Sequence, residues 1–127
     1  MTTTNEHAVK VLNGLIETTL DSAGGYREAA ENAHNTQYKT MFTERADKRT
    51  ALAGQLQQEV RTFGGEPETH QTMLGRAHNK FVDLKNAVMG GGNDKAVITE
   101  VERGEDFIKS KFEHAARDAE GRSWRRR

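Results

Sequence analysis

The sequence has no cysteine, a single proline and few aromatic residues. Without cysteine the chain cannot form a disulfide, a thiolate metal site, an iron–sulfur cluster or a cysteine nucleophile. A single proline leaves room for long uninterrupted helices, because proline breaks helix interiors. Hydrophobic residues make up 34% of the 127 residues and aromatic residues only 6%. The core must therefore be thin, which suits helices with narrow apolar stripes.

The chain also lacks a net charge and a long hydrophobic run. Its 19 Lys and Arg residues balance 19 Asp and Glu residues, so no overall field steers it toward nucleic acid or an anionic membrane. No apolar run approaches the roughly 20 residues of a membrane span, and the N-terminal sequence lacks the layout of a secretory signal. We expect a soluble, cytoplasmic protein with no membrane partner.

What the sequence does contain is a helical spacing of apolar residues in four segments. These residues recur at steps of three and four, which places them on one face of a helix. The second segment ends at Gly64-Gly65 and the third at Gly90-Gly91-Gly92, as glycine often ends helices. No segment alternates apolar and polar residues long enough to predict a strand. The four stripes cover residues 12–30, 38–63, 74–88 and 97–119.

Four helices with short connections are antiparallel neighbours, and a bundle is the arrangement that buries four apolar stripes. We therefore predict an all-α protein, an antiparallel four-helix bundle. The bundle is expected to form one domain over residues 1–119. Residues 120–127 follow it as a polar, Arg-rich tail.

Charged residues lie on the apolar stripes of this predicted bundle. Arg45 and Arg49 project within roughly 30° of the centre of the second stripe, and Glu105 projects within about 40° of Val101. An unpaired charge in the interior is strongly destabilising, so the sequence predicts a paired polar layer. The layer either fixes the order and register of the helices or forms a site for a metal, an anion or a proton-transfer step. Its expected members are Arg45, Arg49, His78, Glu102 and Glu105.

The ligand set argues against a complete metal centre. A di-iron carboxylate bundle takes an inward Glu from each of two helices and a Glu-x-x-His pair from each of the other two. The one such pair, Glu31 and His34, ends the first segment, and the fourth segment carries Glu102-x-x-Glu105 without histidine. The arginines of the second stripe repel a dication. We expect no cofactor, and a di-iron or other divalent metal is the disfavoured alternative. The candidate metal ligands are Glu105, Glu102 and His78.

The C-terminal tail is the one indication of a nucleic-acid partner. It places Trp124 among four arginines, a composition that contacts phosphates and stacks on bases. The same tail is equally compatible with a solvated extension or with packing on a neighbouring subunit. Because the body behind it is neutral, the sequence does not favour specific nucleic-acid binding. The arginines are Arg122, Arg125, Arg126 and Arg127.

The small core favours a homodimer. A chain with little apolar material gains stability by burying further surface against a second copy, usually with two-fold symmetry. Phe107 lies about 120° off the centre of its stripe, and the glycine pair Gly24-Gly25 permits the close approach of another backbone. We predict a homodimer whose interface includes Phe107 or this glycine pair.

Four segments of the sequence are similar to a bacterial protein family. They are LNGLIETTLDSAGGYREAAE (12–31), ERADKRTALAGQLQQEVRTFGGEPE (44–68), DLKNAVMGG (83–91) and EVERGED (100–106). In this order they resemble a family of unknown function, identified as a ferritin-like four-helix bundle and often associated with general stress proteins. The resemblance implies that fold and a shared role for Glu102 and Glu105. It also implies a metal centre, which the ligand set above does not complete.

Together these patterns predict a helical bundle that acts by self-association or protein binding, without catalysis, and the resemblance implies an association with stress. The alternative is a ferritin-like metal-binding or redox protein with a carboxylate and histidine site in the bundle core.

Overall fold

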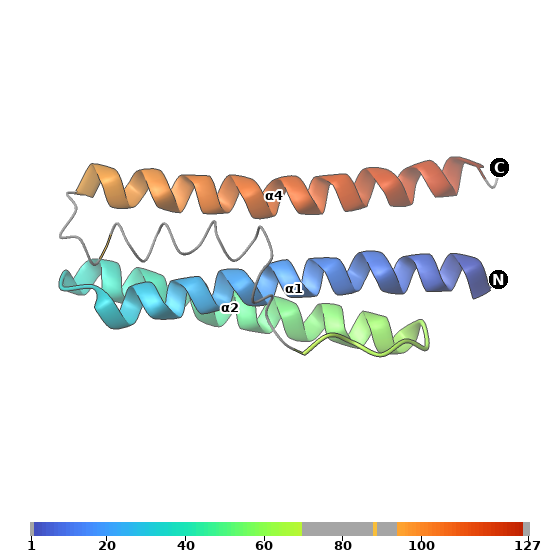
Figure 1. Ribbon diagram of the computed structural model, residues 1–127, viewed down its shortest axis with the longest axis horizontal. Helices are drawn as coiled ribbons and strands as arrows, with labels where there is room; N and C mark the ends of the chain where they lie inside the picture. The colour runs from blue at the N-terminus through green and yellow to red at the C-terminus, as the bar shows by residue number, and fades with distance from the viewer. Residues whose placement is uncertain (1, 70–87, 89–93, 126–127) are drawn as a thin grey trace.

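The computed structural model describes residues 2–69, 88 and 94–125 of the chain (Figure 1). This part of the protein is helical and contains no strand, so the all-α class is confirmed for it. It holds three helices, α1 (Thr2–Asn32), α2 (Thr36–Thr62) and α4 (Asp94–Arg125). The predicted helix over residues 74–88 lies outside the described residues, apart from the buried Val88. Three of the four expected helices are thus established.

A short connection makes α1 and α2 antiparallel neighbours. Asn35 caps α2, because its side-chain oxygen accepts hydrogen bonds from the backbone N–H groups of Gln37 (2.8 Å) and Tyr38 (3.3 Å). Lys39 Nζ donates to the carbonyl oxygen of Ala30 in the last turn of α1, at 2.9 Å. Figure 1 shows α4 running opposite to α1, with both chain ends at the same end of the molecule.

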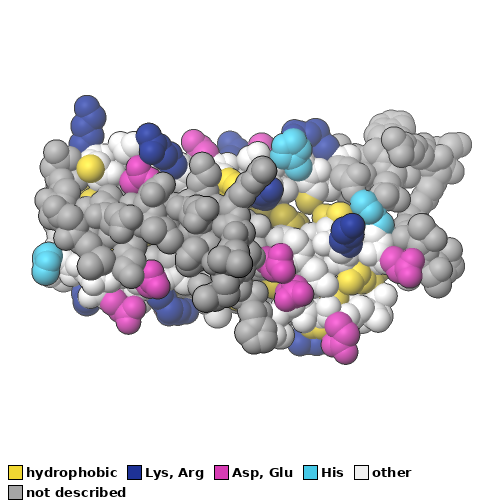
Figure 2. All heavy atoms as spheres, viewed as in Figure 1, with side chains coloured by type: hydrophobic (Ala, Val, Ile, Leu, Met, Phe, Trp, Pro, Cys, Tyr) yellow, Lys and Arg dark blue, Asp and Glu magenta, His cyan; other side chains and the backbone are white. Residues whose placement is uncertain are grey.

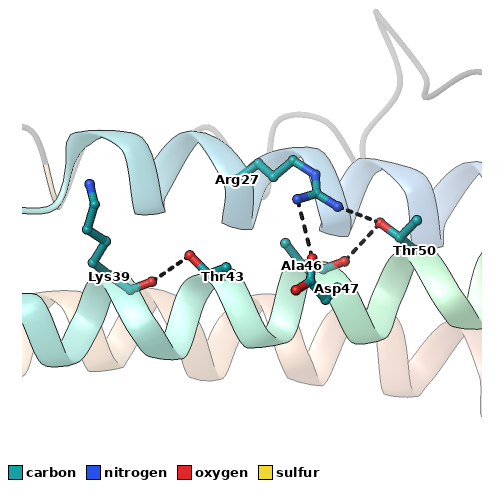
Figure 3. Close-up of polar contacts among 6 residues, drawn as sticks. All are labelled: Arg27, Lys39, Thr43, Ala46, Asp47 and Thr50. Atoms are coloured by element: carbon teal, nitrogen blue, oxygen red, sulfur yellow. Dashed lines mark hydrogen bonds and ion pairs between the residues drawn. The ribbon is translucent and has the colours of Figure 1, made fainter.

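The outer seam between α1 and α2 is polar. Figure 3 shows Arg27 reaching from α1 to Thr50 and Asp47 on α2, at 2.9 Å and 3.5 Å. Both members of the Arg27–Asp47 ion pair are largely exposed, and such pairs contribute about 1 kcal/mol or less. The pairing of the two helices therefore depends on their apolar faces.

One buried cluster lies toward the end of the molecule away from the chain termini. Tyr26 and Phe42 are fully buried there and their rings stack at 5.9 Å between centroids. Nearer the termini, Ile16 and Val60 are fully buried, whereas Leu12 and Phe112 are only half-buried. Figure 2 shows hydrophobic side chains between charged ones on that half of the molecule. The buried cluster at the other end is made of Tyr26, Ala29, Ala30, Phe42, Ala46, Val88, Val97 and Val101.

The end of α2 follows the sequence prediction. Gly64 has a φ of 81°, in the left-handed region that glycine adopts without strain, and donates its N–H to the Arg61 carbonyl at 2.9 Å. Beyond it, the side-chain amide of Asn13 donates to the carbonyl of Glu66 at 3.0 Å and accepts the N–H of Glu68 at 2.8 Å. Gln57 donates to the Glu68 carbonyl at 2.8 Å. Residues 66–68 are thereby tied to the outside of both helices.

Helix α4 extends further than the apolar pattern indicates. It runs to Arg125, so the backbone of the predicted tail is helical up to that residue. The side chains of the tail lie outside the described residues, and nucleic-acid binding by its arginines stays a disfavoured prediction. Within the described part of the chain, no helix is long and apolar enough to cross a membrane.

One glycine inside α2, Gly54, lowers the stability of the helix although no close contact requires a glycine there. Gly54 is exposed, and a Cβ at this position would meet nothing within 4 Å. Alanine loses less conformational entropy in a helix than glycine does, so Gly54→Ala should raise the free energy of unfolding by about 1 kcal/mol. Urea denaturation measures this change. Gly64→Ala is the control and should be destabilising, because its φ of 81° strains any residue with a Cβ.

Candidate functional site

Glu105 of α4 is bound by side chains from both other described helices. Arg49 hydrogen bonds to its Oε1 atom and forms an ion pair with it. Tyr26 donates its hydroxyl hydrogen to Oε2, and Arg45 Nη1 lies 3.3 Å from the same oxygen. We call Tyr26, Arg45, Arg49 and Glu105 the ionic cluster. Both carboxylate oxygens of Glu105 are therefore occupied.

Helical spacing brings these groups together. Arg45 and Arg49 are four residues apart on α2 and so share one face of it. Arg49 also donates from Nε to the hydroxyl of Ser22 on α1 at 3.2 Å. The guanidinium of Arg45 lies over the Tyr26 ring, 5.9 Å from its centroid, which is a cation–π contact. The cluster thus joins α1, α2 and α4 at one level.

The cluster is partly shielded from water. The side chain of Arg49 is 19% exposed, that of Glu105 31% and that of Arg45 36%. Burial raises the pKa of Glu105, but the hydrogen bonds from Arg49 and Tyr26 and the charges of the two arginines outweigh it, and the net shift lowers the pKa below its usual value. Burial, reinforced by the hydrogen bond to Glu105 and by its negative charge, raises the pKa of Tyr26.

These shifts decide what the cluster can do chemically. A general acid or base works best when its pKa lies near the working pH. Here the carboxyl pKa moves further below neutrality and the phenol pKa further above it. Glu105 therefore stays ionised and Tyr26 stays protonated at neutral pH. The arrangement suits a fixed hydrogen-bond network and does not suit proton transfer.

The structure brings together three of the five residues expected in the polar layer. Arg45, Arg49 and Glu105 meet as described above. Glu102 is exposed instead, because it projects about 60° away from Glu105 around α4 and that rotation turns it to solvent. His78 lies outside the described residues.

The cluster does not provide a metal site. Across residues 2–69, 88 and 94–125, no three His, Cys, Asp or Glu side chains are grouped so that they could hold a metal ion. The one carboxylate in the cluster already binds two guanidiniums, which repel a divalent cation. The residues described here therefore do not fit the di-iron centre that a ferritin-like fold implies.

Tyr26 and Ser22 were not among the residues expected in the polar layer. Both supply polar atoms to the cluster. The available signal was the spacing of Thr19, Ser22 and Tyr26, which carry hydroxyl groups at three- and four-residue steps along the buried face of α1. Buried hydroxyls need hydrogen-bond partners, so this spacing points to a polar neighbour on the facing helices.

Two cavities flank Arg49. One, of about 310 Å³, is lined by Met41, Glu44, Arg45, Lys48 and Arg49 of α2. The other, of about 320 Å³, lies between α2 and α4, with Leu52, Ile108 and Phe112 as its apolar wall and Lys109 on its lining. The lining of the first has three basic residues and one acidic residue, whereas the lining of the second has two basic and two acidic residues beside its apolar ones.

Comparison with known proteins gives one family match. A family model described as Domain of unknown function (DUF2383) matches residues 7–118, a range that includes every member of the ionic cluster. No curated protein and no solved structure matches the chain. The family description assigns no activity to its members.

Proposed function

The chain belongs to the family described as a domain of unknown function (DUF2383), and we propose that it is a non-catalytic helical bundle that acts by self-association or protein binding. The four-helix, ferritin-like architecture, the association with stress and the location in the cytoplasm enter this proposal from the sequence patterns and the resemblance described above. The observation that carries it is the ionic cluster, in which Glu105 is bound by both arginines and by Tyr26.

The cluster has the properties of a structural connection. It links three helices through charge-assisted hydrogen bonds, which are stronger and more directional than neutral ones. The pKa of its carboxylate is lowered and the pKa of its phenol is raised, so both move away from the range of acid–base catalysis. A partly shielded polar network that joins three helices favours one order and register of those helices.

The distribution of apolar surface supports self-association. Leu12, Phe107 and Phe112 are only half-buried, so part of their apolar surface is open to water. Covering them with a second copy would remove apolar area from water, at about 25 cal/mol per Å². Of the two interface regions predicted from the sequence, the Phe107 region is the one we retain, since Gly25 is buried.

Iron binding tests the non-catalytic part of the proposal. Protein purified without chelator is analysed for metals before and after soaking with Fe(II) and desalting. We expect no stoichiometric iron, because Arg45 and Arg49 occupy the carboxylate that a metal needs. Retention of one or more iron ions per chain, lost in Glu105→Gln, would establish the metal-binding alternative instead.

Mass measurement tests self-association. Light scattering across a hundredfold dilution should give the mass of two chains at high concentration. Phe107→Glu should shift the equilibrium toward the monomer, because it places a charge in the expected interface. Ile98→Glu is the matched control, since Ile98 is 46% exposed and projects about 180° away from Phe107 around α4. A monomeric mass at every concentration would contradict self-association.

A further inference from the structure

One face of α2 carries more positive charge than the described residues neutralise. Arg45, Lys48 and Arg49 line the cavity of about 310 Å³, and Glu44 is the only acidic residue among the described residues that line it. Behind the wall, Glu105 is a single carboxylate shared by two guanidiniums. Tyr26 donates a hydrogen bond to that carboxylate and adds no negative charge. A positive excess at a concave and partly shielded surface attracts an anion.

Hydrogen-bond donors on this face remain available. A guanidinium has five N–H donors, and Arg45 directs only Nη1 at Glu105 while its side chain stays 36% exposed. Lys48 is exposed and three residues further along α2, on the same face of the helix. Its ammonium adds three donors beside the guanidinium. Two cationic side chains with several donors line one cavity, and this composition matches an anion with several oxygens.

We propose that this cavity is a binding site for a small phosphomonoester, with Arg45 and Lys48 holding the phosphate group. A phosphate ester presents three strong acceptor oxygens and carries a charge of about −1.5 to −2 at neutral pH. A carboxylate offers only two oxygens for the same donors. The cavity is also larger than a phosphate group alone requires, and Met41 provides an apolar wall for the organic part. Glu44 accepts hydrogen bonds from a hydroxyl group of the same molecule.

The second cavity provides an internal comparison. Its basic residue Lys109 shares the lining with Asp106, and Arg49 and Glu105 there neutralise each other. It therefore has no charge excess to select an anion. Lys48 and Lys109 are both exposed lysines on helices, so neutralising each in turn separates the proposed site from a general effect of charge.

The test is a titration of the full chain by isothermal calorimetry in phosphate-free buffer at fixed ionic strength. Glycerol 3-phosphate, inorganic phosphate, propionate and chloride are the four ligands. We expect saturable one-site binding of glycerol 3-phosphate and weaker or undetectable binding of propionate and chloride. Lys48→Gln should raise the dissociation constant about tenfold or more, because it removes a charge-assisted hydrogen bond. Lys109→Gln should leave the constant unchanged.

Circular dichroism confirms that both variants are folded before the comparison is made. Inorganic phosphate that binds more weakly than the ester supports the ester as the ligand, and equal binding assigns the phosphate group alone as the species recognised. Three outcomes would overturn the proposal. They are no saturable binding of either phosphate compound, equal loss of binding in both lysine variants, and propionate binding as tightly as glycerol 3-phosphate.

Discussion

Replacing Glu105 with glutamine should lower the free energy of unfolding by about 2–3 kcal/mol, somewhat less than the 3–5 kcal/mol typical of a fully buried ion pair. The variant keeps the size of the side chain and removes its charge. Arg45 and Arg49 would then face each other across a neutral amide in a partly shielded site. Their mutual repulsion and lost solvation are the source of the destabilisation. Urea denaturation followed by circular dichroism measures it.

The matched control is Glu102→Gln, one turn earlier on α4. Glu102 is exposed, so this variant removes the same charge from the same helix outside the ionic cluster and should change stability by no more than about 0.5 kcal/mol. If the two variants unfold at the same denaturant concentration, the cluster does not stabilise the fold.

Acid titration separates the charge effect from a packing effect. The pKa of Glu105 is lowered in the folded protein, so the folded state binds its proton less readily than the unfolded chain does. Its stabilising contribution is complete above the ordinary carboxyl pKa of about 4.3 and is lost as pH falls through the folded value. The stability gap between wild type and Glu105→Gln should therefore narrow on acidification. A gap that stays constant at every pH would indicate packing instead.

Gly65→Ala should destabilise the protein by about 1–3 kcal/mol, the usual cost of overpacking. A Cβ at this position would lie 2.6 Å and 2.7 Å from the two methyl groups of Val9 and 3.2 Å from a methyl group of Val60. Valine has a stiff χ1 angle, so neither side chain can rotate away freely. The segment around residue 65, just after α2, would have to move away from α1. Thermal and urea unfolding report the loss.

A second substitution identifies the cause. Val9→Ala removes both methyl groups in closest contact, so adding it to Gly65→Ala should cost less than the two single changes combined. Gly54→Ala introduces the same methyl group in open space and should stabilise. Strict additivity of Val9→Ala and Gly65→Ala would show that the predicted contact is not the source of strain.

Periodicity predicted the helices well because it depends on local geometry. The stripes place α2, the end of α1 and the stop at Gly64 close to where the structure has them, whereas α1 begins at Thr2, ten residues before its stripe. The same geometry put Arg45, Arg49 and Glu105 on inner faces, and the structure pairs them. The end of α4 was not predicted, because after Ala119 the helix continues without an apolar pattern. Arg and Glu are good helix formers without being apolar.

Features that depend on two helices at once were out of reach of the sequence. Whether Glu102 or Glu105 faces the interior depends on the rotation of α4 about its axis, which the stripe fixes only to within tens of degrees. The role of Tyr26 was missed for a related reason. Its ring belongs to the core and its hydroxyl to the ionic cluster, and a hydropathy pattern assigns the whole residue to one class.

The hydrogen bonds of the Asn13 side-chain amide constrain the order of folding events. Its two backbone partners lie 53 and 55 residues further along the chain, so these hydrogen bonds close a long loop. That closure is entropically cheap only after α1 and α2 have already paired, which brings the two ends together. During synthesis Asn13 emerges well before Glu66 and Glu68. Its two hydrogen bonds therefore cannot form until those residues have been added. The path of residues 66–68 beyond α2 thus depends on a residue of the first helix, and a misaligned α1–α2 pair would lack these two hydrogen bonds.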